Sequence, residues 1–330
     1  MKKVDVEIYT LSDKVSATQE VRVNGVKVRI FGAKSISDGI KIPSHELTNA
    51  LEKSDADIIH LHGFHSLLPY YVLKARSNLE HKLVMTPHYH GIGHSFLRNI
   101  LFRFYKPTLR KMANYSNKII SVSSYEKSLI LRDFGVDNEK VVIIPNGISF
   151  EGINRLYPTQ KDKNKILSVG RLEKYKNFDK VIRAMKLLAD THFSLTIIGD
   201  GPERSKLLDL IRKLELNNKV FLKSNLTKEE LFYEYANSSF FVLPSYYEAY
   251  GIAVAEAQSL GLNVIVSNAG ALSEFIAGNY AYGITLPVTP EKIAHTIIEA
   301  SRGVKPIDKY VPYTWDKAVE ELMQLYESLI

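Results

Sequence analysis

The chain has 330 residues, of which 45% are hydrophobic and 24% charged, so it is long and apolar enough to build two globular domains. It contains no cysteine, which excludes disulfide bonds and thiol catalysis. Its formal net charge of +7 favours a phosphate-bearing partner: a nucleotide, an acidic lipid surface or nucleic acid. No apolar run approaches the roughly 20 residues of a membrane-spanning helix, and the N-terminus lacks the apolar core of a signal peptide. A cytoplasmic location is therefore expected.

Short β-branched runs alternate with amphipathic patterns along the chain, which predicts an α/β protein with parallel sheets. The predicted strands form two series. The first comprises Val4–Tyr9, Val26–Phe31, Asp57–Leu61, Leu83–Thr86, Ile119–Val122 and Val141–Ile144, and the second Ile166–Val169, Leu195–Ile198, Val220–Leu222, Phe240–Leu243 and Asn263–Val266. The polar stretch 151–164 predicts a linker between a domain at 1–150 and a domain at 165–311. Residues 312–330 predict a final helix.

A loop between a buried strand and a helix has the pattern of a ligand site. The strand ends near Leu243, Gly251 opens an apolar helix, and Gly261 closes it. The N-terminus of such a helix presents free N–H groups and the positive end of its dipole, which suit a diphosphate. Glu248 and Glu256 can face one cleft there, and their carboxylates can accept hydrogen bonds from sugar and ribose hydroxyls. Two ordinary surface glutamates would give the same pattern.

Two further turns at strand ends carry basic residues or glycine. Gly170-Arg171-Leu172 is followed by Lys176, so Arg171 and Lys176 could converge on one anion. Each charge-assisted hydrogen bond would contribute about 1.5–3 kcal/mol. Gly199-Asp200-Gly201-Pro202 predicts a tight turn before a helix, which ordinary strand-to-helix connections also contain.

These motifs, preceded by Ile144-Pro145-Asn146-Gly147, stand in an order that resembles the family 4 (group 1) retaining glycosyltransferases. Glu248 and Glu256 match that family's Glu-x7-Glu motif, and the resemblance extends from about residue 57 to the C-terminus. It implies a GT-B fold, with two Rossmann-like domains, a cleft between them, and a C-terminal helix that crosses back to the first domain. Residues 1–150 would then form the acceptor domain and residues 165–311 the donor domain.

The resemblance also implies roles for single residues. Arg171 and Lys176 would bind the donor diphosphate, Glu248 the donor sugar and Glu256 the ribose. Tyr250 stands where the family usually has phenylalanine, and this departure could tune the sugar pocket. The donor, a UDP-, GDP- or ADP-sugar, is a substrate, and neither a cofactor nor a metal is implied. The full donor-binding set is Arg171, Lys176, Gly201, Glu248, Tyr250, Gly251, Ile252 and Glu256.

Histidines are concentrated at two strand ends of the first half. Imidazoles at such spacing can ligate zinc, but no carboxylate or cysteine completes a clear ligand set. Thr86-Pro87-His88 resembles the family's Thr-x-His, whose histidine contacts the donor sugar near the reacting carbon. His88 is the candidate and His90 the alternative, since the doubled histidine leaves the register open. The histidines concerned are His60, His62, His65, His88, His90 and His94, of which His60 and His62 are interpreted as strand-end and loop residues.

The segment from Asp55 to Asp57 resembles the Asp-x-Asp metal motif of other glycosyltransferases. Its position before a buried strand favours a strand start instead.

The stretch from Phe96 to Lys118 mixes aromatic and basic residues. One interpretation is an amphipathic helix on an anionic membrane surface, at the inner face of the membrane, that reaches a lipid-linked acceptor. The other is a helix that packs on its sheet and exposes a solvated basic face. No recognised nucleic-acid-binding module is present, so nucleic acid is not an expected partner.

The N-terminal region departs from the family pattern. Val4 to Thr10 resembles the family's second strand, and Asp13 to Arg22 the loop after it. The family's first strand, Gly-Gly loop and first helix are not visible before Val4. We expect a lost N-terminal segment; a true truncation would leave an exposed sheet position.

The sequence therefore predicts transfer of a sugar from a nucleoside-diphosphate donor to a hydroxyl of a glycan or lipid-linked acceptor, with retention. Two alternatives stay open. One is a non-catalytic nucleotide-sugar-binding subunit that needs a partner, and the other is a GT-B epimerase that acts on the nucleotide-sugar itself. The motifs do not identify the base, the sugar, the acceptor or the oligomeric state.

Overall fold

The computed structural model describes residues 4–37, 40–64, 66–75, 81–91, 96–149, 161–303 and 308–330. The chain divides into two compact units. Unit 1 comprises Met1–Ser121, Leu129–Val142 and Leu325–Ile330, and unit 2 comprises Val122–Ser128 and Ile143–Gln324. Of the predicted linker, residues 151–160 lie outside the described residues, and a strand already begins at Asp162.

Unit 2 contains a parallel sheet in the order β11-β10-β9-β12-β13-β14. Its central strands are buried on both faces, which explains their continuous apolar sequences. The predicted strands of this half are confirmed, and the short edge strand β14 was not predicted. The strands are β9 (Asp162–Val169), β10 (Ser194–Ile198), β11 (Val220–Lys223), β12 (Ser238–Leu243), β13 (Asn263–Ser267) and β14 (Tyr282–Ile284).

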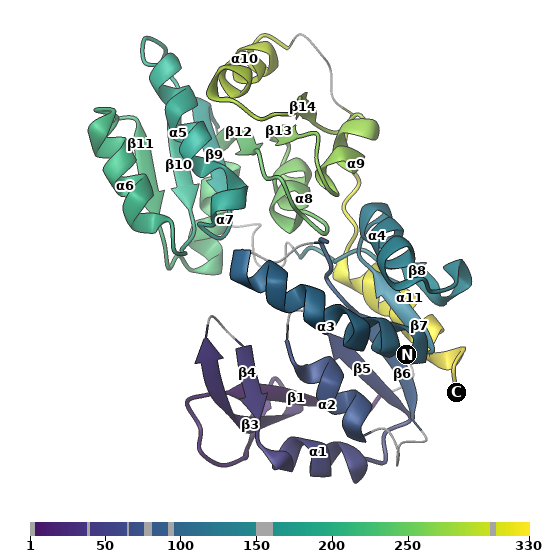
Figure 1. Cartoon of the computed structure of the whole chain (residues 1–330). Helices are drawn as coiled ribbons and strands as arrows, with labels where there is room; N and C mark the ends of the chain where they lie inside the picture. Colours follow the sequence, from purple (N-terminus) through teal and green to yellow (C-terminus); the bar gives the residue numbers. More distant parts are fainter. Residues whose placement is uncertain are drawn as a thin grey trace. The chain divides into compact units, whose positions relative to one another are not determined.

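Helices flank this sheet (Figure 1). Their apolar faces form its core: α5 buries Val181, Ile182 and Met185, as the helical period predicts. On α6, helical spacing places Leu207, Leu208, Ile211 and Leu214 on one face, but only Leu207 and Ile211 are buried and Leu208 is 38% exposed. The helices are α5 (Phe178–Leu187), α6 (Arg204–Lys213), α7 (Lys228–Ala236), α8 (Ile252–Ser259), α9 (Leu272–Ala277) and α10 (Pro290–Ser301).

The first sheet of unit 1 is mixed, with the order β1-β3-β2 and with β4 paired to β3. β1 (Glu7–Ser12) is parallel to β3 (Val26–Ser37), whereas β2 (Gln19–Val23) and β4 (Ile40–Pro43) are antiparallel to it. The prediction of a loop from Asp13 to Arg22 is therefore wrong from Gln19 onwards. The dipeptide Asn24-Gly25, with φ of 51° and 83°, joins β2 to β3, and Asn-Gly between alternating valines is a strong hairpin signal.

A second sheet of unit 1 has the order β5-β6-β7-β8, and its predicted strands are confirmed within about two residues. The last residues of helix α11 (Trp315–Glu327) belong to unit 1 from Leu325 onwards. The strands are β5 (Ile58–His62), β6 (Lys82–Thr86), β7 (Lys118–Ser121) and β8 (Val141–Ile143). The helices are α1 (His45–Glu52), α2 (Leu68–Ala75), α3 (Phe96–Tyr115) and α4 (Ser124–Phe134).

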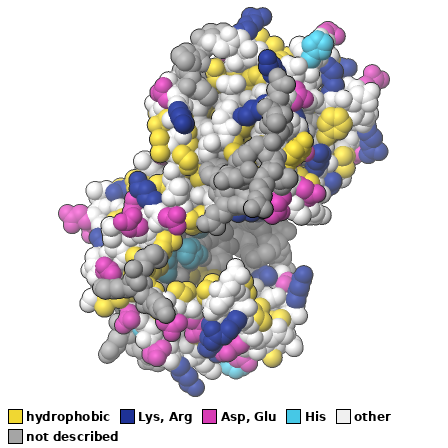
Figure 2. Space-filling view, turned by 180° about the vertical axis from the view of Figure 1, so that it is seen from behind, with side chains coloured by type: hydrophobic (Ala, Val, Ile, Leu, Met, Phe, Trp, Pro, Cys, Tyr) yellow, Lys and Arg dark blue, Asp and Glu magenta, His cyan; other side chains and the backbone are white. Residues whose placement is uncertain are grey.

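The charges of the chain do not gather into one patch on the face that Figure 2 shows. Basic and acidic side chains are interspersed there. In the described part of the chain, no helix combines the length and the apolar character that crossing a bilayer requires.

Candidate active site

The sheet order of unit 2 determines where a ligand site can form. β9 lies in the middle of the sheet, between β10 and β12. From β9 the chain first adds β10 and β11 on one side, and it then returns to add β12, β13 and β14 on the other side. The loops that follow β9 and β12 consequently leave the sheet in opposite directions. In open parallel sheets, ligands bind at this switch point, outside the carboxyl ends of the strands. These two loops carry Lys176 and Glu248.

Hydrogen bonds hold the two loops together. The backbone N–H of Tyr246 donates to the carbonyl of Tyr175 at 2.9 Å. The Asn177 side chain donates to the carbonyl of Pro244 at 2.7 Å. Asn177 has φ of 57° and only 4% of it is exposed, and asparagine tolerates this left-handed conformation better than most residues. Its role in the site was not predicted, although an asparagine just before a helix is a usable signal.

This arrangement brings Lys176 and Glu248 into direct contact. The Lys176 ammonium forms an ion pair with Glu248 Oε1, and the two side chains are 10% and 15% exposed. Each charge is thus compensated within a poorly hydrated environment, where an isolated charge would be costly. The two residues were predicted to hold different parts of one donor, and the structure places them side by side.

Arg171 has a different environment. Its side chain is 67% exposed and pairs with Glu173 at 2.9 Å. The convergence of Arg171 with Lys176 on one anion stays a prediction. Because the guanidinium of Arg171 is exposed, it can reorient toward such an anion at little cost.

The glycines of the turn after β10 bring two loops together. A Cβ on Gly199 would lie 2.0 Å from the carbonyl oxygen of Gly170, and a Cβ on Gly201 would lie 2.7 Å from that of Leu172. The Leu172 N–H also donates to the carbonyl of Asp200 at 2.9 Å. Glycine is thus required for this close backbone packing, whether or not Gly201 also binds the donor.

Helix α8 begins as predicted at Gly251, whose φ of 105° suits glycine, and Ile252 is the first helical residue. Further along α8, Glu256 Oε2 accepts a hydrogen bond from the Tyr235 hydroxyl at 2.9 Å. Burial raises the pKa of the Glu256 carboxyl, whereas the bond from Tyr235 lowers it. Tyr235 was not singled out in the sequence, because nothing local links α7 to α8.

Tyr250 makes a contact that its predicted role did not include. Its hydroxyl lies 3.3 Å from the hydroxyl of Tyr310, and its ring lies 6.2 Å from that of Phe275. The hydroxyl that distinguishes this residue from the family's phenylalanine therefore has a partner within unit 2. Its predicted effect on the sugar pocket stays a prediction.

In unit 1, three imidazoles from β5 and from the loop after β6 lie next to one another. The ring centroids of His60 and His62 are 4.2 Å apart, and those of His62 and His88 are 5.9 Å apart. His60 is hydrogen-bonded through Nδ1 to the Tyr326 hydroxyl at 2.6 Å and through Nε2 to the Thr86 hydroxyl at 2.7 Å. Both partners are hydroxyl groups, so one ring nitrogen can donate and the other can accept, as a neutral ring requires.

His88 has φ of 50°, a left-handed conformation that costs a residue with a side chain roughly 1–2 kcal/mol. The neighbouring backbone is held in place, since the N–H of Phe64 donates to the carbonyl of Pro87 at 2.9 Å. Strained residues of this kind cluster at functional sites, which supports His88 as the candidate. His90 is half-buried, and His65 and His94 lie outside the described residues. No group of three His, Asp or Glu side chains within the described ranges is placed to hold a metal ion.

These histidines predict a loss of stability in mild acid. Burial lowers the pKa of His60 to about 3 and that of His88 to about 4. Unfolded histidines titrate near 6.5, so between these values the unfolded chain binds more protons than the folded one. The contribution of these histidines to stability should be constant well above pH 6.5 and should fall as the pH decreases, by about 2 kcal/mol from His60 at pH 5.

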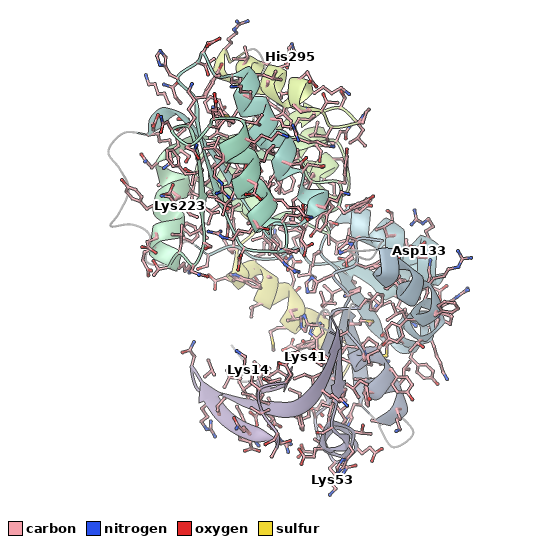
Figure 3. All side chains as sticks on the ribbon, turned by 60° about the vertical axis from the view of Figure 1, so that its left-hand side comes forward. Lys14, Lys41, Lys53, Asp133, Lys223 and His295 are labelled. Atoms are coloured by element: carbon pink, nitrogen blue, oxygen red, sulfur yellow. The ribbon has the colours of Figure 1, made fainter. Side chains whose placement is uncertain are left out.

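Urea unfolding at pH 5 and pH 7.5 measures this effect. His60→Asn should reduce the difference in stability between the two pH values. His295→Asn, at an exposed histidine of α10 (Figure 3), controls for the loss of one imidazole. An equal pH dependence in His60→Asn and the parent protein would contradict the expectation.

Helix α3 confirms that the aromatic and basic segment is helical. Leu109, Met112 and Ala113 are fully buried, whereas Phe104 is 79% exposed. Lys106 pairs with Asp133 at 3.4 Å, and Asp133 is labelled on α4 in Figure 3. The helix thus packs on unit 1 through one side and exposes an aromatic ring on another.

Comparisons with known proteins agree with this geometry. The model for glycosyl transferases group 1 matches residues 151–313, and the model for glycosyltransferase family 4 matches residues 1–151. An uncharacterized glycosyltransferase of Methanocaldococcus jannaschii is 31% identical over 234 residues, which span 64% of this chain and 60% of that relative.

Solved structures show the same fold. Sucrose-phosphate synthase from Thermosynechococcus elongatus aligns with a TM-score of 0.77 at 18% identity, over 98% of this chain and 89% of that one. Anabaena HepE, solved in complex with UDP and glucose, aligns with a TM-score of 0.66 at 19% identity, over 92% of this chain and 86% of that one. The fold is the GT-B fold of glycosyltransferases, and the chain belongs to glycosyltransferase family 4, group 1.

Proposed function

We propose that this glycosyltransferase moves a sugar from a nucleoside-diphosphate donor to a hydroxyl acceptor, with retention at the anomeric carbon. The observation that carries the proposal is the contact between Lys176 and Glu248 at the switch point of unit 2, just before the N-terminus of α8. A cation, a carboxylate and free backbone N–H groups are thereby available for one phosphorylated, hydroxyl-rich ligand. HepE was solved with UDP and glucose, which supports a donor of this class here.

In this proposal the ammonium of Lys176, the guanidinium of Arg171 and the N–H groups at Gly251 and Ile252 stabilise the departing diphosphate. When the donor binds, its phosphate replaces Glu248 as a partner of Lys176, and Glu248 is released toward sugar hydroxyls. The acceptor hydroxyl attacks from the side of the leaving group, so no protein nucleophile is required. Catalysis then rests on positioning and electrostatic stabilisation.

Further along α8, Glu256 binds the ribose hydroxyls, while Gly201 and Tyr250 complete the donor-binding loops. His88 of unit 1 is proposed to contact the donor sugar. Positive side chains and helix N–H groups supply the charge in this scheme, which therefore works without a metal or a cofactor.

For the acceptor, we propose a lipid-linked or other glycan that is reached at an anionic membrane surface through α3. The exposed ring of Phe104 beside the exposed basic residue Arg103 supports this. Cosedimentation with phosphatidylglycerol vesicles, compared with phosphatidylcholine vesicles, tests it. Binding that is equally weak to both would reject the membrane contact.

A thermal-shift screen with UDP-glucose, GDP-mannose and ADP-glucose tests the donor class. At a hundred times its Kd, a ligand stabilises the folded state by about 2.7 kcal/mol, which raises Tm by about 5 °C or more in a domain of this size. A transferase should also release the nucleoside diphosphate slowly from its donor. A binding subunit should release none, and an epimerase should release an altered sugar nucleotide without an acceptor. No Tm change with any donor would reject the proposal.

A further inference from the structure

The carboxylate of Glu256 is held by a residue from another helix. Tyr235 on α7 is fully buried, and its hydroxyl donates to Glu256 Oε2 at 2.9 Å. The same hydroxyl lies 3.4 Å from the carbonyl of Ala253, one turn earlier on α8. Among the described residues, Glu256 Oε1 receives no hydrogen bond, so one carboxylate oxygen is engaged and the other is available.

The helix that carries Tyr235 is anchored at both ends. Thr227 and Glu230 form a capping box at its N-terminus. Near its C-terminus, Glu234 pairs with Lys165 of β9 and with Lys223 of β11, each at 2.7 Å (Lys223 is labelled in Figure 3). Glu234 is adjacent to Tyr235, so these ion pairs hold the backbone of Tyr235 against the sheet.

Ring contacts restrict the Tyr235 side chain as well. It stacks on Phe241 of β12 with 5.9 Å between ring centroids and lies 6.1 Å from Phe232. A phenol packed in this way has little rotational freedom, so its hydroxyl occupies a defined position. A fixed donor in turn selects one orientation of the carboxylate that it binds.

We propose that Tyr235 is a positioning residue for donor binding: its hydroxyl orients Glu256 so that Oε1 can accept a hydrogen bond from a ribose hydroxyl. This inference rests on the proposed function, because it takes the ribose of a nucleoside diphosphate as the partner of Glu256. Tyr235 acts through Glu256 and does not touch the ligand.

The same bond favours the ionised form of the carboxylate. Burial raises the pKa of Glu256, and the bond from Tyr235 opposes this rise. Burial also raises the pKa of the Tyr235 hydroxyl well above its usual value, and the charge of Glu256 raises it further, so Tyr235 stays a donor throughout the working pH range. Without the hydroxyl, the pKa of Glu256 should rise further. Its carboxylate should then become protonated, and stop accepting a hydrogen bond from the ribose, at a higher pH.

Tyr235→Phe tests the proposal, because it keeps the ring and removes only the donor. The probes are UDP, GDP and ADP, titrated by calorimetry from pH 5.5 to pH 8.5 with the parent protein and the variant. We expect the nucleotide that binds best to lose about tenfold in affinity at neutral pH. We also expect the pH below which binding weakens to be higher in the variant. Tyr233→Phe, which alters a 45% exposed residue of the same helix, should leave both unchanged.

A double-mutant cycle separates positioning from a structural effect. In a Glu256→Gln background, Tyr235→Phe should cause no further loss of nucleotide affinity. Unchanged affinity and pH profile in Tyr235→Phe, with a clear loss in Glu256→Gln, would overturn the inference and leave the proposed function intact. Failure of all three nucleotides to bind the parent protein would overturn the proposed function and the inference together.

Discussion

Lys176→Ala is expected to lower kcat/KM for the donor between about tenfold and a hundredfold. This range corresponds to the loss of one or two charge-assisted hydrogen bonds to phosphate. The structure adds a second reason, since Glu248 would then lack its cation partner at the place where the diphosphate should bind. Both effects weaken donor binding. Steady-state kinetics with varied donor concentration, together with nucleotide titration, measure them.

A matched control lies in the same turn. Lys174 and Lys176 both belong to the 3-10 turn 174–176, but Lys174 is exposed whereas Lys176 is 8% exposed. Lys174→Ala removes an equal charge and should leave kcat/KM within about twofold of the parent, as for most surface substitutions. Arg171→Ala should lower turnover at least about tenfold without loss of stability, because its side chain is mostly exposed. Unchanged kinetics in both Lys176→Ala and Arg171→Ala would refute the phosphate assignment.

Gly199→Ala is expected to destabilise unit 2 by about 3 kcal/mol or more, a size reached only when a substitution forces a severe clash. The new Cβ would lie 2.0 Å from the carbonyl oxygen of Gly170. That backbone is held by hydrogen bonds from Gly170 to Ile198 at 3.0 Å and from Leu172 to Asp200 at 2.9 Å. Relief of the clash would break these bonds and displace the loop that leads to Lys176.

The comparison variant is Gly303→Ala, also in unit 2. Gly303 has φ of 62°, and among the described residues no atom lies within 4 Å of a Cβ added there. This variant should therefore lose only the roughly 1 kcal/mol that the left-handed backbone conformation costs. Urea unfolding of the two variants and the parent isolates the clash. If Gly199→Ala proves no less stable than Gly303→Ala, the close packing of the two loops is not rigid in solution.

The regular elements could be predicted because their signals are local. The face of α5 follows from apolar residues at helical spacing, and β12 follows from a short apolar run that Pro244 ends. The hairpin of β2 and β3 could also have been found, since Asn24-Gly25 is an adequate signal. The separation of unit 1 into two sheets could not be predicted. Strand pairing depends on backbone hydrogen bonds between distant segments, which leave no periodicity in the sequence.

The candidate site, like the fold, could be predicted from the sequence only in part. The sequence by itself determined the family, the α/β class and the residues expected to bind the donor, because motifs at strand ends are short and contiguous. Its prediction of parallel sheets holds for unit 2 but not for the first sheet of unit 1, where β2 and β4 are antiparallel to β3. Only the tertiary structure decided that Lys176 and Glu248, 72 residues apart, form an ion pair, and that Tyr235 holds Glu256. These contacts arise from the order of strands in the sheet and from the packing of α7 beside α8. Both are products of long-range burial, and no local pattern of residues encodes them.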